Sequence, residues 1–370
     1  AYALKARVLL YAASPLFNGN ADYAKFANED GTLLFAPKDD SKWGKAAAAA
    51  KEAIDKIEGS SYYGLYYSDE PDNGYRNYME LFLPSKKWNK EYIFARNQGT
   101  GYSDNIHQEK CMAANGMGGW SGLCPTQELV DAYEMANGST PIIGYNADGT
   151  PIINGASGYS ETGFAATAGK HYPAGVYNMY VGREPRFYAS INFNGQQWRG
   201  RQLEFWQGGK DGINVSKVDY CCTGYLLRKT ADEGVDVING KGGMKEASIL
   251  FRVGSLYLDY AEALNEAEGP VDDVYKYVDA IRKRAGLPGL AKGLDKDKMR
   301  ERIQHERQIE LAFEAGHRYF DCHRWKIAEK TDNGYMHGMN ITATNKVDYS
   351  KRSTVGDSRV FEKKHYLFPI

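Results

Sequence analysis

Apolar residues recur at steps of three and four positions between residues 248 and 330, a spacing that lines one face of an α-helix. Gly269-Pro270 and Gly286-Leu287-Pro288 interrupt the pattern, because glycine frees the backbone and proline cannot continue the helical hydrogen bonds. The pattern predicts helices over 248–267, 271–285 and 298–315, and a short fourth helix after Gly316. Paired helices with short turns are typical of helical-repeat proteins.

Two more helices are predicted near the start of the chain, over residues 2–13 and 42–57. The second follows Ser41, a typical N-cap, and its run of alanines favours a helix and lets a neighbour approach closely. Each of the five longer helices has a single apolar face, so we expect them to form one contiguous array. About 190 residues separate the second helix from the third, and an insertion of that length should fold as a second lobe with its own core.

The inserted residues predict short and mixed elements. We expect a strand over 91–96, a long irregular loop over 97–122, a helix from Pro125 to Gly138 and a β-hairpin within 140–155. Residues 187–192 alternate in polarity, which predicts a strand before a turn at Asn194-Gly195. The tyrosines at 62, 63, 66 and 67 follow a predicted helix, and we expect them in the core.

Composition and charge narrow the classes of function. The chain has 370 residues and a formal net charge of −1, so it has no overall positive field for nucleic acid. No apolar run approaches the roughly 20 residues of a membrane-spanning helix. The five cysteines fit no zinc pattern. A disulfide between Cys111 and Cys124 and a set of buried thiols both stay open.

A charged run in the last helices invites a catalytic interpretation. Glu306, Glu310 and Glu314 are four residues apart and share one helix face, and carboxylate pairs perform glycoside hydrolysis. Arginines are interleaved with them, which favours ion pairing over a raised carboxyl pKa. We find no zinc-protease, nucleophile-elbow or phosphate-loop motif. We therefore predict no catalytic residues and no enzymatic activity.

The segment from Asp69 to Glu80 has the spacing of a calcium loop in part. Its third position is Pro71, which has no side-chain oxygen to offer a metal. An acidic turn explains the segment more simply. We predict no cofactor and no metal site, with calcium at this turn as the alternative.

Several stretches of the chain together resemble the SusD/RagB family of surface nutrient-binding lipoproteins from Bacteroidetes-type bacteria. The stretches that carry the resemblance are YALKARVLLYAASPLF, PTQELVDAYEMANG, GREPRFYASINFNGQQW, RVGSLYLDYAEALNEA, VDAIRKRAGLPGL and ERQIELAFEAGHRYFDCHRW. The resemblance implies a mostly α fold, with tetratricopeptide-like helical repeats and a large irregular α+β lobe that carries the ligand. It also implies a lipid anchor at the outer membrane and a SusC-like TonB-dependent transporter as partner.

The periodicity and the resemblance together predict four segments. They are a helical-repeat pair at 1–58, the irregular ligand-binding lobe at 59–247, helical-repeat pairs at 248–330, and an irregular C-terminal segment at 331–370 that packs on the core. The resemblance also leads us to expect that the sequence is a fragment, which lacks an N-terminal portion with a signal sequence and a lipid-modified cysteine.

Aromatic residues in loops are the remaining candidates for ligand binding. Trp120 lies between glycines in GMGGWSG without apolar neighbours, which is typical of an exposed aromatic side chain. Tyr102 and Asn105 share its predicted loop, and Trp206 is a weaker candidate. We expect Trp120 and Tyr102 to contact the ligand.

We predict non-catalytic capture of an oligosaccharide or polysaccharide for import with the transporter. A RagB-like peptide binder is the alternative, and a surface glycoside hydrolase is a more remote one. A helical-repeat adaptor without a ligand pocket is a further alternative.

Overall fold

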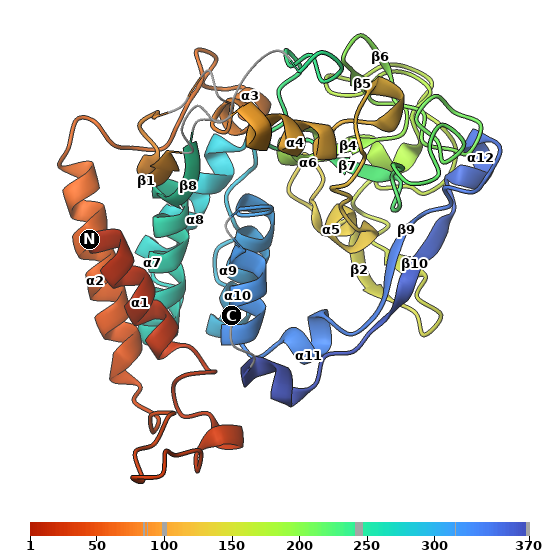
Figure 1. The fold of residues 1–370 in the computed structure, drawn as a ribbon. Coiled ribbons are helices and arrows are strands. Elements are labelled where there is room, and N and C mark those ends of the chain that lie inside the picture. The colour runs from red at the N-terminus through yellow and green to blue at the C-terminus, as the bar shows by residue number, and fades with distance from the viewer. Residues whose placement is uncertain (84–85, 87, 98–101, 241–246, 315, 368–370) are drawn as a thin grey trace.

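The structure is a computed structural model that describes residues 1–83, 86, 88–97, 102–240, 247–314 and 316–367. Figure 1 shows a row of helices on one side and a lobe of loops, short helices and strands on the other. The helices are α1 (Tyr2–Ala13), α2 (Ser41–Glu58), α3 (Gly74–Glu80), α4 (Tyr102–Met112), α5 (Gln127–Ala132), α6 (Pro185–Ser190), α7 (Val253–Glu268), α8 (Asp272–Arg284), α9 (Lys296–Glu310), α10 (His317–Arg324), α11 (Ala328–Thr331) and α12 (Lys346–Tyr349).

The strands are short and pair two by two in antiparallel fashion. The pairs are β1 (Tyr92–Asn97) with β8 (Ala247–Arg252), β2 (Ile142–Tyr145) with β3 (Pro151–Ile153), β4 (Ile191–Phe193) with β7 (Tyr225–Leu227), β5 (Gln197–Trp198) with β6 (Arg201–Gln202), and β9 (Gly334–Met339) with β10 (Arg352–Arg359). The mostly α fold with an inserted lobe is confirmed.

The five longer helices share one hydrophobic core, as the single apolar face of each predicted. Leu10 of α1, Ile54 of α2, Leu258 of α7, Val278 of α8 and Ile303 of α9 all belong to it. Four alanines of α2 face this core and let α1 and α7 pack closely against α2, namely Ala46, Ala47, Ala50 and Ala53. The array is therefore contiguous, although its second and third helices are far apart in the sequence.

Two boundaries of the array differ from the prediction. Residues 247–252 form strand β8, and the helix begins only at Val253. Ile249 and Phe251 suit a strand, and pairing with β1 satisfies the backbone of this segment. Helix α9 ends at Glu310, and a turn follows it. The end predicted at residue 315 lies outside the described residues.

The lobe has a core of its own, with Tyr180, Phe187, Phe193 and Tyr225 among its buried side chains. Strand β1 and the β2–β3 hairpin form where they were predicted. The predicted strand over 187–192 is wrong for its first part, because α6 occupies residues 185–190 and begins with a proline, which suits a first helical turn. Residues 186–190 are all buried, so their alternation did not mark an inner and an outer face.

The remaining corrections concern segments that the sequence presented as irregular. Residues 97–122 contain α4, so this stretch is not one long loop. The helix expected from Pro125 to Gly138 is limited to α5, because Tyr133 is already extended. Residues 331–370 include the β9–β10 hairpin and α12, and Tyr349 of α12 joins the core of the lobe.

Two of the four tyrosines assigned to the core are in fact exposed. The exposed fractions of Tyr62 and Tyr63 are 58% and 37%, whereas Tyr66 is buried and Tyr67 packs against the core of the array. All five cysteines are free thiols in this structure. No helix among the described residues is long and apolar enough to cross a membrane.

The close packing of α2 predicts the effect of enlarging one of its alanines. Ala50 is 1% exposed and faces the shared core, whereas Ala48 on the same helix is exposed. The substitution Ala50→Leu should lower the free energy of unfolding by about 1–3 kcal/mol, because the core has no room for the extra methylenes. Urea unfolding measures this change. Ala48→Leu is the matched control, and equal effects of the two substitutions would contradict the arrangement of α2.

Candidate functional site

A buried network of ion pairs joins the lobe to the helical array. Arg186 of α6 contacts Glu306 and Glu310 of α9, with nitrogen–oxygen distances of 2.5 and 3.1 Å. From the array, Arg282 contacts Glu306 at 3.1 Å, and Arg284 pairs with Glu310. All five side chains are nearly inaccessible to solvent. The contacts between α6 and α9 therefore hold the two parts of the chain in register.

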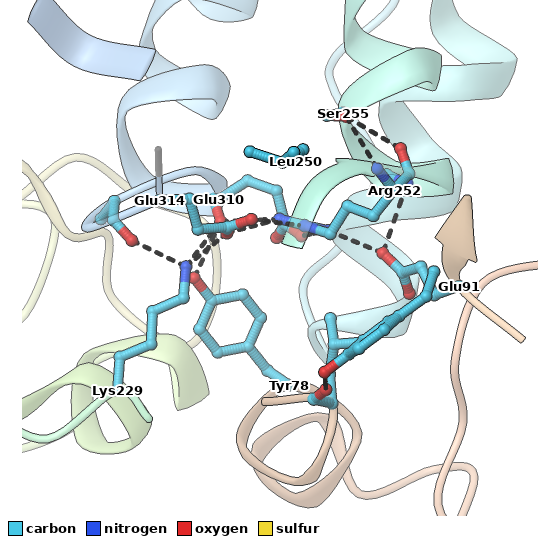
Figure 2. Close-up of polar contacts among 12 residues, drawn as sticks. Tyr78, Glu91, Lys229, Leu250, Arg252, Ser255, Glu310 and Glu314 are labelled. Atoms are coloured by element: carbon cyan, nitrogen blue, oxygen red, sulfur yellow. Dashed lines mark hydrogen bonds and ion pairs between the residues drawn. The ribbon is translucent and has the colours of Figure 1, made fainter. Parts of the chain in front are cut away.

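The network continues beyond the end of α9. Figure 2 shows Glu310 and Glu314 around Arg252 and Lys229, with Glu91 on another side of Arg252. Arg252 lies 2.7 Å from Glu91, 2.9 Å from Glu310 and 2.8 Å from Glu314. Lys229 of the lobe lies 2.6 Å from Glu314. One arginine of the array thus joins three carboxylates, and one lysine of the lobe adds a further link.

The surrounding cations keep the three glutamates ionised. Burial alone would raise the pKa of Glu310, but Arg284, Arg252 and Arg186 lower it to about 2. The pKa values of Glu306 and Glu314 are also lowered by arginines, against the effect of burial. A general acid of a glycosidase needs a raised pKa instead. The predicted interpretation of this charged run as an ion-pair network is confirmed.

A second feature is an aromatic hollow in the lobe, between the start of α3 and the loop at 169–173. Two adjoining cavities, each of about 350 Å³, share Tyr75, Lys170, His171 and Tyr172 in their walls. The Tyr75 and His171 rings stack with their centroids 4.8 Å apart, and the Tyr172 ring stacks on Tyr188 at 6.1 Å. Burial lowers the pKa of His171 to about 4, and Lys170 and Arg228 add to the effect, so the ring is neutral at pH 7. The walls thus offer flat, neutral aromatic surfaces.

Two glycines set the shape of the aromatic hollow. A Cβ at Gly74 would lie 2.3 Å from the carbonyl of Ala285, so only glycine lets the start of α3 approach the end of α8 and place Tyr75 there. A Cβ at Gly169 would lie 2.4 Å from the ring of Tyr172. Both close approaches fix where the aromatic rings stand.

Polar groups without partners line the same hollow. The Oε1 atom of Gln196 and the Nε atom of Arg228 are buried and have no hydrogen-bond partner among the described residues. The Nη2 atom of Arg228 donates to the Tyr75 hydroxyl at 2.6 Å and to Glu233 at 3.2 Å. Buried polar atoms are rarely left unpaired in proteins, so an acceptor and a donor next to a cavity indicate a place for a polar ligand or for water.

Trp120, the first of the predicted ligand contacts, is not among the described residues that line the aromatic hollow. Trp120 follows α4 and is half-buried. Its ring lies 5.3 Å from that of exposed His107, and the Lys110 ammonium lies 5.3 Å from its centroid. Tyr102 and Asn105 begin the same helix, and their side chains are outside the described part of the structure. Trp120 thus packs beside His107 and Lys110 of α4.

Trp206 is neither a lining residue of the aromatic hollow nor a neighbour of Trp120 in the ring contacts described above. It is half-buried against the core of the lobe, and the Lys346 ammonium lies 5.1 Å from the centroid of its ring. Sequence reasoning did not select the lining residues Tyr75, His171, Tyr172, Gln196 and Arg228. His171-Tyr172-Pro173 lies in a glycine-rich stretch, as Trp120 does, so the argument used for Trp120 also applies there. Nothing in the local pattern marked Gln196 or Arg228.

The alternative calcium turn has its own cation. Arg76 lies 2.6 Å from Asp69, 2.5 Å from Glu70 and 2.6 Å from Glu80. Asn73 accepts a hydrogen bond from the backbone of Arg76 and caps α3. Asp69, Glu70 and Glu80 therefore share Arg76 as an ion-pair partner.

Comparison with known proteins defines the class. The model of the SusD family matches residues 83–370. This match covers more than half of the sequence, and the chain therefore belongs to the SusD family.

Individual relatives agree with this assignment. The chain is similar to the solved structure of BT4246, with 26% identity and a TM-score of 0.78 over 99% of this chain and 67% of that one. A SusD-like protein from Bacteroides fragilis has 26% identity and a TM-score of 0.66, over 99% of this chain and 60% of its own. SusD-like protein P25 of Formosa agariphila is 42% identical over 82 residues, which are 21% of this chain and 15% of P25.

The paired carboxylates predict how stability depends on pH. The pKa of Glu310 is lowered from 4.5 to about 2 in the folded protein, so its contribution is fully present above about pH 4.5 and is lost as the pH falls towards 2. This shift corresponds to about 3 kcal/mol. Glu306 and Glu314 act in the same direction, whereas the pKa of Glu184 is raised, mainly by burial, and opposes them.

We therefore expect the free energy of unfolding to fall steeply between pH 4.5 and 2, as urea unfolding at a series of pH values can measure. Glu310→Gln should be less stable at pH 7 and should show a shallower slope in this range. Glu52, whose side chain is 43% exposed and pairs with Lys5, provides the control Glu52→Gln, which should keep the wild-type slope. A slope that Glu310→Gln leaves unchanged would contradict the ionised state of this network.

Proposed function

We propose that this protein binds an oligosaccharide or polysaccharide without catalysis, and that the aromatic hollow beside α3 holds part of that ligand. The observation that carries the proposal is the combination, in one cavity, of stacked aromatic rings with buried polar atoms that lack partners. Membership of the SusD family, which has a surface nutrient-binding role, also supports the proposal of saccharide binding.

The chemistry of the hollow suits a sugar. The C–H face of a pyranose ring packs on a flat aromatic side chain such as Tyr172, while its hydroxyls both donate and accept hydrogen bonds. Gln196 offers an acceptor and Arg228 a donor, so each finds a partner in one polyhydroxylated ligand. Because the His171 ring is neutral at pH 7, it adds aromatic surface without charge. Trp120, Tyr102, Asn105 and Trp206 stay in the proposal as contacts of a longer chain.

We further propose that the protein acts on the outer face of the outer membrane through a lipid anchor and delivers its ligand to a SusC-like TonB-dependent transporter. The proposal includes no cofactor and no hydrolytic step. A RagB-like role in peptide binding is the second candidate, and the cations Lys170 and Arg228 at the hollow favour it, because they also suit peptide carboxylates.

The test begins with a glycan and peptide array probed with the full-length protein. The glycan that binds is then titrated by calorimetry against wild type and Tyr172→Ala. Stacking on this ring buries apolar area on the order of 100 Å², worth about 2 kcal/mol, so the substitution should weaken binding about tenfold or more. Tyr335→Ala removes a tyrosine that is 55% exposed on β9 and serves as the control, with unchanged affinity expected.

Trp120→Ala forms a further arm of the same titration. If Trp120 contacts a longer glycan, this variant weakens binding of the long chain and leaves the melting temperature nearly unchanged. Unchanged binding by both Tyr172→Ala and Trp120→Ala would remove both residues from the site. Binding of peptides alone on the array would favour the RagB-like role, and release of reducing sugar from a bound glycan would overturn the non-catalytic proposal.

A further inference from the structure

A second hollow lies in the helical array, away from the lobe. Its volume is about 490 Å³, within the roughly 300–1,000 Å³ range of ligand pockets. Five separate parts of the chain form it: Pro15 after α1, the first turn of α2, the second half of α7, α9 from Asp297 to Gln304, and the residues that follow α10. None of these residues lines the aromatic hollow, so this array hollow is a distinct feature.

Two tryptophans stand at the array hollow. Trp43 of α2 is half-buried, and its indole N–H has no hydrogen-bond partner among the described side chains and backbone groups. Trp325 is 8% exposed, and its indole N–H donates to Glu262 at 2.7 Å. The guanidinium of Arg324 lies over the Trp325 ring, 4.7 Å from its centroid, so that face of the ring is covered. Trp43 is the ring that a ligand can reach.

The polar groups around Trp43 include both donors and acceptors. Arg300 donates to both oxygens of Glu266, at 2.5 and 2.6 Å, and pairs with Asp297 at 2.5 Å. Glu262 is held by Arg324. The amide of Gln304 and the carboxylate of Glu301 have no partner within the described part of the chain. Most of the charges therefore cancel in pairs, whereas hydrogen-bonding capacity is left over.

Paired charges together with unpaired hydrogen-bonding groups favour one class of ligand in the array hollow. A cationic peptide side chain would need several unpaired carboxylates, and Glu301 alone is unpaired here. An anion would meet the carboxylates of Glu262, Glu266 and Asp297. A neutral polyhydroxylated molecule can pack one face on an indole ring and can use the free donor of Trp43 and the free groups of Gln304 and Glu301 together.

We infer that the array hollow is a second saccharide-binding site, formed by Trp43, Gln304 and Glu301. The inference rests on the proposed function, because it assumes that a saccharide is the ligand of this protein. A polymer long enough to reach both places would be held at the lobe and at the array, and its effective affinity would exceed that of either site.

The experiment uses the full chain with three probes, cellohexaose, xylohexaose and mannohexaose, in isothermal titration. Wild type should take up two molecules of at least one hexasaccharide per chain. Trp43→Ala should reduce this number to one, because one binding site loses its aromatic wall. Tyr172→Ala should also reduce it to one by removing the site in the lobe, and the double variant should bind neither molecule.

Trp43 also packs against the core of the array, so Trp43→Ala can weaken binding through a loss of stability. Gln304→Leu is therefore a second variant that tests the same site. This substitution removes an unpaired amide and should weaken the second site about three- to tenfold, as expected for the loss of one hydrogen bond, with an unchanged melting temperature. Trp88→Ala removes an exposed tryptophan outside both hollows and is the matched control.

The outcomes separate the two proposals. Uptake of one hexasaccharide that Tyr172→Ala abolishes, with no effect of Trp43→Ala or Gln304→Leu, overturns the second site and leaves the proposed function intact. Uptake of one hexasaccharide that Trp43→Ala abolishes and Tyr172→Ala retains supports the array hollow and removes the ligand from the lobe. If wild type takes up none of the three probes, the second site is overturned. The proposed function is then decided separately, by the glycan and peptide binding screen described above.

Discussion

Burial of charge between the lobe and the helical array is the constraint on which this structure depends. Taking a guanidinium or a carboxylate out of water costs several kcal/mol, and the cost is offset only when each charge finds good partners. Arg186 of the lobe finds them on α9, and Lys229 of the lobe finds one in Glu314. Because a displaced lobe would leave these charges buried without partners, the network disfavours other arrangements of the two parts.

The same network determines where the aromatic hollow forms. Tyr188, in its wall, lies on α6, the helix that carries Arg186. Arg228 precedes Lys229 in the chain, and Gly286 follows the end of α8, the helix that carries Arg284. Elements that line the cavity are thus anchored by a neighbouring residue with a buried charge. Rigid support of this kind keeps polar groups positioned for a ligand at little cost in conformational entropy.

The sequence was informative where a helix had one apolar face against solvent. Helices α1, α2, α8 and α9 each have such a face, and their shared core was predictable for that reason. Helix α7 is buried from residue 253 to 265 and was predicted from its apolar spacing, but the same kind of argument failed for the short buried helix α6. In α6 all of the residues from 186 to 190 are buried, so no alternation or stripe reports the local conformation. Strand β8 was missed for a different reason: its partner β1 is remote in the sequence, and the apolar spacing continued into α7.

The site was harder to predict than the fold. Trp120 was selected because glycines surround it, and that local argument cannot show which distant residues share a cavity with an aromatic ring. The aromatic hollow combines α3, the loop at 169–173, Gln196 and Arg228, and only the tertiary arrangement brings these together. By contrast, the interleaved signs of the charged run indicated ion pairing without a structure, because neighbouring opposite charges on one helix face leave little reason for a raised pKa.

A double-mutant cycle between the lobe and the array tests the role of the network most directly. Arg186→Met, Glu306→Gln and the double variant are compared with wild type by urea unfolding at pH 7. If the Arg186–Glu306 contact holds the lobe on the array, the double variant is less destabilised than the sum of the single variants, with a coupling energy of about 0.5–3 kcal/mol. A coupling energy indistinguishable from zero would contradict the account.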